Sequence, residues 1–160
     1  MKILALEFSS SQRAVAVSDG VNPIARVVTD NLKTSPLLLI DEVLEKGRTD
    51  RAEINVIALG IGPGSYTGIR SAIAVAQGWQ LAKSVKLSPI SSAEVLAATA
   101  RVEGQRGETH LIIDAQRHEH YYTTWNLTET EQTETKPLSI IGVVEAFELE
   151  SFGPDQPGMR

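Results

Sequence analysis

The order of apolar and polar residues predicts three short strands at the start of the chain. Residues 2–8 are apolar and suited to a strand, and Val15 and Val17 alternate with other residues within 13–18. Asp19-Gly20 follows, a strong signal for a tight hairpin turn, before a third apolar segment at 24–29. Short strands joined by tight turns predict an antiparallel meander.

Helical spacing of the apolar residues then replaces this alternation. The first helix has one apolar face, made of Leu37, Ile40, Val43 and Leu44. A later stretch is almost wholly apolar, as in a strand buried on both faces. The predicted elements are a helix over 36–46, a strand over 55–60, a helix over 67–83, a strand over 86–88 and a helix over 92–102.

The strand pattern returns after the turn-rich stretch 103–107. Glu7 and Asp114 each end an apolar strand, and a polar turn and a returning strand follow each of them, which indicates a weak internal repeat. We therefore expect two halves, residues 1–103 and a shorter 104–160. The second half is predicted to hold strands over 110–115, 120–127 and 132–136, and a helix over 141–149.

Composition places the 160-residue chain among globular proteins, with 42% hydrophobic and 22% charged residues. It has no cysteine and no apolar run of membrane-spanning length, so we expect a cytoplasmic protein with neither disulfides nor thiol catalysis. Residues 1–100 hold ten basic and nine acidic residues, whereas 101–160 hold five and eleven. The acidic C-terminal third argues against a direct, tight grip on nucleic acid and favours a basic protein partner.

A glycine-rich loop joins the buried strand to the second helix, where ligands often bind in open α/β sheets. It lacks the lysine of a phosphate-binding P-loop, since no lysine stands between the loop and Lys83. Two interpretations stay open, a tight turn that packs the helix on the sheet and an anion site at the helix start. The residues of the loop motif are Gly62, Pro63, Gly64, Ser65, Tyr66, Thr67, Gly68 and Arg70.

Small residues are unusually frequent in the helix after the loop. They either pack on the sheet or let a second molecule approach closely, and the run 37–40 is wider than one core-facing stripe. We expect the helices at 36–46 and 67–83 to form an apolar interface that also drives self-association. Its predicted residues are Leu37, Ile40, Leu44, Ser71, Ala74, Val75 and Gly78.

Candidates for catalysis and metal binding are few. Glu7 and Asp114 could hold Mg²⁺ or orient water as a carboxylate pair, or merely cap turns. His118 and His120 share a strand face, but no third ligand accompanies them, so a solvated strand face is favoured. We therefore predict no catalytic residue, no metal and no cofactor.

The loop strongly resembles the hallmark of the TsaB (YeaZ) family, and three further segments within residues 1–125 are similar to that family in the same order. The family's opening strand, a helix start and its "DAR-x-x-E-x-Y" hairpin correspond to Ile3-Leu4-Ala5-Leu6-Glu7-Phe8-Ser9-Ser10, Ser91-Ser92-Ala93-Glu94 and Asp114-Ala115-Gln116-Arg117-His118-Glu119-His120-Tyr121. The resemblance implies an α/β fold of the actin/Hsp70-like ATPase type, with two RNase H-like halves related by duplication and a truncated second half here.

The resemblance also implies a role in making N6-threonylcarbamoyladenosine in tRNA. TsaB pairs there with the catalytic subunit TsaD, the ATPase TsaE joins them, and tRNA is contacted only indirectly. A homodimer is possible in isolation. ATPases of this fold open with Asp-x-Gly-Thr/Ser, but this chain has Glu7-Phe8-Ser9-Ser10, which crowds the phosphate position. We expect a non-catalytic scaffold, the alternative being an ATP- or phosphate-binding enzyme that uses Glu7 and the loop 60–68.

Overall fold

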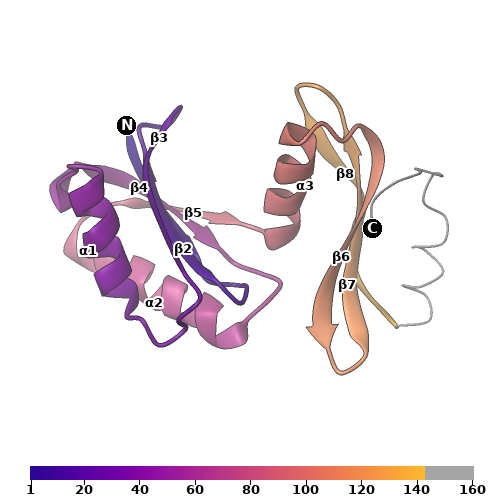
Figure 1. Ribbon diagram of the computed structural model, residues 1–160, viewed down its shortest axis with the longest axis horizontal. Coiled ribbons are helices and arrows are strands. Elements are labelled where there is room, and N and C mark those ends of the chain that lie inside the picture. Colours follow the sequence, from indigo (N-terminus) through magenta and orange to yellow (C-terminus); the bar gives the residue numbers. More distant parts are fainter. Residues whose placement is uncertain (143–160) are drawn as a thin grey trace. The chain divides into compact units, whose positions relative to one another are not determined.

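A computed structural model describes residues 1–142 of the protein. The chain divides into two compact units, Met1–Val95 and Leu96–Arg160 (Figure 1). The division lies within the helix α3, Ser92–Val102, whereas the sequence places it after residue 103. Each unit is described by itself.

The first unit is a five-stranded mixed sheet with the strand order β3-β2-β1-β4-β5. The strands β1 (Lys2–Glu7), β2 (Arg13–Ser18) and β3 (Pro23–Thr29) form the expected antiparallel meander. The strands β4 (Ile54–Gly60) and β5 (Lys86–Ile90) run parallel to β1.

Two helices, α1 (Pro36–Lys46) and α2 (Tyr66–Ala82), cover one face of this sheet (Figure 1). The alternation along β1 explains why, because Leu4 and Leu6 point to the same face and are paired with apolar residues of β2 and β4. That face forms one core with the helices. Its buried members include Val15, Val17, Ile57 and Leu59 from the sheet, Leu39, Ile40, Val43 and Leu44 from α1, and Ala72 and Ala76 from α2.

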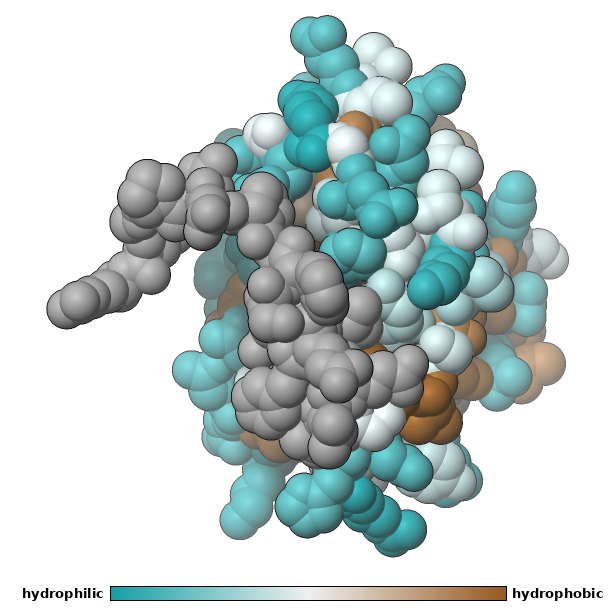
Figure 2. All heavy atoms as spheres, turned by 90° about the vertical axis from the view of Figure 1, so that its right-hand side faces the viewer, coloured by the Kyte–Doolittle hydropathy of each residue, from teal (hydrophilic) through white to brown (hydrophobic). Residues whose placement is uncertain are grey.

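The second unit is a three-stranded antiparallel sheet with the order β6-β7-β8, built from β6 (Gly107–Gln116), β7 (Glu119–Leu127) and β8 (Gln132–Gly142). Most residues of β8 are exposed. On the face shown in Figure 2, hydrophilic and intermediate side chains predominate outside the grey atoms, and hydrophobic ones gather toward the lower right. The described part of this face is therefore chiefly polar.

Two strands continue past a proline at which the sequence pattern ended them. The expected strand 86–88 extends through Pro89 to Ile90, and the expected strand 132–136 extends through Pro137 to Gly142. Proline cannot donate a backbone hydrogen bond, but an edge strand has one side that needs no donor, and β5 and β8 are both edge strands.

The helix predicted over 141–149 is wrong at its start, because Ile141 pairs with His120 in the sheet. The β-branched pair Ile140 and Ile141 prolongs β8, and the burial of Ile141 beside Tyr122 favours that extended form. The remainder of that predicted helix, and the tail 156–160 that we expect to be dispensable for stability, lie outside the described residues. In residues 1–142, no helix is long and apolar enough to cross a membrane.

Candidate functional site

The glycine-rich loop lies directly against the turn between β1 and β2. The amide of Ser65 donates to the carbonyl of Ser9 at 2.6 Å. A side chain at Gly64, whose φ is +153°, would overlap that same carbonyl, and one at Gly68 would overlap the carbonyl of Phe8. These two glycines are needed because one backbone packs on another without space for a Cβ.

Further hydrogen bonds fix the loop at both ends. Ser65 caps α2, since its hydroxyl accepts from the amide of Gly68 at 3.3 Å. The amide of Ser92, at the start of α3, donates to the carbonyl of Gly62 at 2.7 Å, and the hydroxyls of Ser9 and Ser92 lie 2.9 Å apart. The loop thus joins the turn after β1 to the starts of two helices.

The remaining residues of the loop motif have different positions. Pro63 follows a cis peptide bond and is half-buried, whereas Tyr66, Thr67 and Arg70 are exposed. The guanidinium of Arg70 lies 5.2 Å from the centre of the Tyr66 ring. The motif therefore has one part that packs on the turn after β1 and an exposed part on the first turns of α2.

Glu7 caps its own turn. Its Oε1 accepts from the amide of Ser9 at 2.6 Å, and its carboxylate fills the space that a side chain at Gly60 would need. Asp114 belongs to the second unit, and His118 occupies the β6–β7 turn with a φ of +66°. Within the described range 1–142, no group of three or more His, Cys, Asp or Glu side chains could hold a metal ion.

A groove of about 600 Å³ lies along α2, beside the start of α1 and the short helix η1 (Arg51–Glu53). We call it the α2 groove. Its lining is mainly apolar and small. It consists of Leu37, Arg51, Ala52, Ala74, Val75, Gly78, Trp79, Ala82 and Lys83.

Four of the predicted interface residues, Leu37, Ala74, Val75 and Gly78, line the α2 groove. Ser71 is half-buried and does not line it. The prediction is wrong for Ile40 and Leu44, whose exposed fractions are 0% and 5%, because they face the sheet within the core. Leu37 and Leu38 lie on the other side of α1 and are 51% and 63% exposed.

The sequence interpretation missed the other five groove residues, which are Arg51, Ala52, Trp79, Ala82 and Lys83. The Arg51 guanidinium lies 5.8 Å from the centre of the Trp79 ring and forms an ion pair with Asp41. The Lys83 ammonium donates to the carbonyls of Ala52 and Ile54, the latter at 3.0 Å. Trp79 stands four residues after Val75, so helical spacing alone could have added it.

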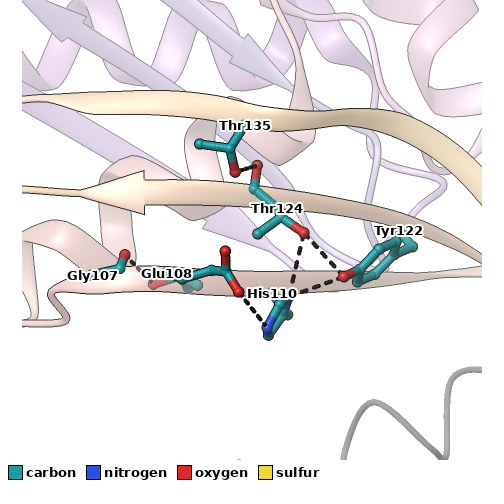
Figure 3. Close-up of polar contacts among 7 residues, drawn as sticks. Gly107, Glu108, His110, Tyr122, Thr124 and Thr135 are labelled. Carbon is teal, nitrogen blue, oxygen red and sulfur yellow. Dashed lines mark hydrogen bonds and ion pairs between the residues drawn. The ribbon is translucent and has the colours of Figure 1, made fainter.

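A polar network was also missed on the sheet of the second unit (Figure 3). His110 Nδ1 lies 3.0 Å from the Tyr122 hydroxyl and 3.3 Å from Thr124 Oγ1, and Thr124 donates to Tyr122 at 3.0 Å. His110 Nε2 lies 3.6 Å from Glu108. Because Tyr122 and Thr124 are only 4% and 3% exposed, their hydroxyls are out of a substrate's reach and the network supports the sheet.

Comparison with known proteins gives consistent matches along the chain. The family profile described as "TsaD: tRNA N6-adenosine threonylcarbamoyltransferase" matches residues 2–149. The tRNA threonylcarbamoyladenosine biosynthesis protein TsaB of Escherichia coli K12 is 29% identical over 131 residues, 81% of this chain and 57% of that protein. TsaB of Haemophilus influenzae is 29% identical over 125 residues, 77% of this chain and 53% of that protein. The chain spans about half the length of the curated relatives it matches.

Solved structures show the same fold. YeaZ from Pseudomonas aeruginosa superposes with a TM-score of 0.79 at 26% identity, over 88% of this chain and 66% of that one. Component A of (R)-2-hydroxyglutaryl-CoA dehydratase from Acidaminococcus fermentans superposes with a TM-score of 0.53 at 14% identity, over 89% of this chain and 48% of that one. At this identity the similarity supports the fold alone. The expected α/β fold of the actin/Hsp70 type, with its mixed sheet, is confirmed. The chain therefore belongs to the family that the matching profile describes, and within it to the TsaB (YeaZ) proteins.

Proposed function

We propose that this protein is a non-catalytic subunit that binds and activates TsaD in the complex that makes N6-threonylcarbamoyladenosine in tRNA. In this proposal TsaE joins the larger complex, and this protein contacts tRNA only indirectly. The complex acts in the cytoplasm. The α2 groove is the observation that carries the proposal. An apolar hollow of about 600 Å³ with the half-exposed Leu37 at its rim is typical of a surface that a partner covers.

The turn after β1 supports the non-catalytic part of the proposal. A phosphate bound there would need free backbone amides, but the amide of Ser9 is already bonded to the Glu7 carboxylate. The glycine-rich loop also packs on the carbonyls of Phe8 and Ser9. The alternative, an ATP- or phosphate-binding enzyme, would have to displace a carboxylate that already satisfies this amide.

The partner interface that we propose consists of the groove residues and their neighbours on α1 and α2. It keeps Leu37, Ser71, Ala74, Val75 and Gly78, gains Trp79, and loses the core residues Ile40 and Leu44. In the absence of TsaD, the same surface lets the chain form a homodimer. The meanders β1–β3 and β6–β8 have the same antiparallel order, which supports two halves related by duplication, 1–103 and 104–160.

The experiment compares two variants of α2 in their binding to purified TsaD. Ala74→Glu places a carboxylate in the groove, where a partner would bury it, so binding should fall at least about tenfold. Gln77→Glu adds the same charge on an exposed position of the same helix outside the groove, and it should bind like the parent. Equal affinities of the two variants would show that the groove is not the interface. Robust ATP turnover by the isolated chain, lost in Glu7→Ala, would overturn the non-catalytic role.

A further inference from the structure

Lys83 has a charge that the described part of its own chain does not balance. The ammonium donates to two backbone carbonyls, those of Ala52 and Ile54, which hold it at one end of the α2 groove. The ion pairs of residues 1–142 join other cations, and Lys83 has no carboxylate within 4.0 Å among them. Arg51 differs, because Asp41 already compensates its guanidinium.

Water solvates the Lys83 ammonium as long as the groove is open. A partner that covers the groove removes this water, and a buried ammonium without a counter-charge costs several kcal/mol. Two carbonyl dipoles reduce that cost but do not neutralise the charge, and one of the three ammonium hydrogens still lacks an acceptor. The segment that fills the groove must therefore bring an acceptor of opposite charge.

The floor of the groove limits the shape of that segment. Ala74 and Gly78 are one helical turn apart and present almost no side chain. A Cβ built at Gly78 meets no atom of residues 1–142 within 4 Å, so space is open above the backbone with respect to that part of the chain. A second helix can approach α2 closely at this point, with an apolar side chain beside Trp79 and Val75.

We propose that the segment of TsaD in the α2 groove is a helix that brings a carboxylate to Lys83 and packs its backbone over Gly78. This inference rests on the proposed function. The carboxylate accepts the remaining ammonium hydrogen, and the pair is shielded from water by the apolar side chains around it. The ion pair fixes the register of the partner helix along the groove, because only one of its turns places an acid at Lys83.

The test measures the affinity of purified TsaD for three Lys83 variants. Lys83→Glu opposes the partner's carboxylate and should weaken binding by about thirtyfold or more, whereas Lys83→Arg keeps a cation and should bind within about threefold of the parent. Lys83→Gln keeps a hydrogen-bond donor for the carbonyls but removes the charge. Its affinity should respond less steeply to salt than that of the parent, because one ion pair is missing. Melting temperatures of the free variants show whether the loss of the Lys83 contacts to Ala52 and Ile54 has destabilised the chain itself.

The outcomes separate this inference from the function on which it rests. If the parent does not bind TsaD, the proposed function fails. If Ala74→Glu abolishes binding but Lys83→Glu binds like the parent with an unchanged salt response, the groove is the interface and the counter-charge is refuted. If Lys83→Glu breaks only a homodimer and leaves TsaD binding intact, the occupant is a second copy of the chain, and the assignment to TsaD is wrong.

Discussion

Gly78→Ala should stabilise the free protein and weaken its binding to TsaD. Gly78 lies inside α2, where glycine costs about 0.5–1 kcal/mol relative to alanine. Its φ is not positive, and an added Cβ meets no atom within 4 Å, so the chain gains helix propensity without a clash. For a chain of 160 residues, this gain corresponds to a rise in melting temperature of about 1–4 °C.

The same methyl group should act against the complex. It stands on the groove floor, where the proposed partner helix comes closest, and overpacking a close contact typically costs about 1–3 kcal/mol. We therefore expect TsaD affinity to fall between about fivefold and about 150-fold. Calorimetric melting of the free chain and titration with TsaD measure the two effects on one protein.

Gly68→Ala is the matched control, because it makes the same change in the same helix. Its Cβ would overlap the Phe8 carbonyl, so it should destabilise the chain strongly. If Gly78→Ala raises the melting temperature but binds TsaD like the parent, close packing of a partner helix over residue 78 is refuted. A lower melting temperature would refute the claim that the isolated chain has no need of this glycine.

Three more changes test the loop and the first hairpin. Ser65→Ala removes the cap of α2 and should lower the free energy of unfolding by at most about 1 kcal/mol. The reconstituted complex should still modify tRNA. If Ser65 were a catalytic nucleophile, the same substitution would abolish activity and leave folding intact. Gly64→Val should lower the free energy of unfolding more than Ser65→Ala does and should weaken TsaD binding, because the φ of Gly64 is +153° and a side chain there would overlap the Ser9 backbone. Urea unfolding measures the stability, and titration with TsaD measures the affinity. The amides of Asn22 and Val21 donate to Asp19 and lower the pKa of its carboxyl, so the stability from this turn is present above the unfolded-state pKa and lost as pH falls through the folded-state pKa. Asp19→Asn should make the urea midpoint less dependent on pH between about 5 and 2.

The sequence pattern predicted the elements of α1 and α2 well, but not which sides of them face solvent. The apolar run 37–40 in α1 covers more than one side of the helix, and Val43 and Leu44 follow it after two acidic residues. Periodicity alone could not decide which side meets the sheet. The position of β2 and β3 decides it, because Ile40 and Leu44 are buried against the sheet and Leu37 is left at the groove.

The charged end of the groove could not be predicted, because it is assembled from distant parts of the chain. Lys83 reaches the carbonyl of Ala52, 31 positions away, and Arg51 stacks on Trp79. No local spacing rule connects these residues. The parallel pairing of β1 with β4, and of β4 with β5, places the end of α2 beside η1. This topology brings Lys83 and Arg51 to the same end of the groove.

The glycines show most clearly what the sequence leaves undecided. Gly60, Gly64 and Gly68 are each explained by a neighbour within the chain, namely the Glu7 carboxylate and the backbones of Ser9 and Phe8. Gly78 has no such neighbour, although in the sequence it is only one more small residue of the same helix. A helix-interior glycine lowers stability, and within residues 1–142 no atom occupies the space that a side chain at Gly78 would need. Because Gly78 lines the α2 groove, we expect the compensating contact at the proposed interface with TsaD.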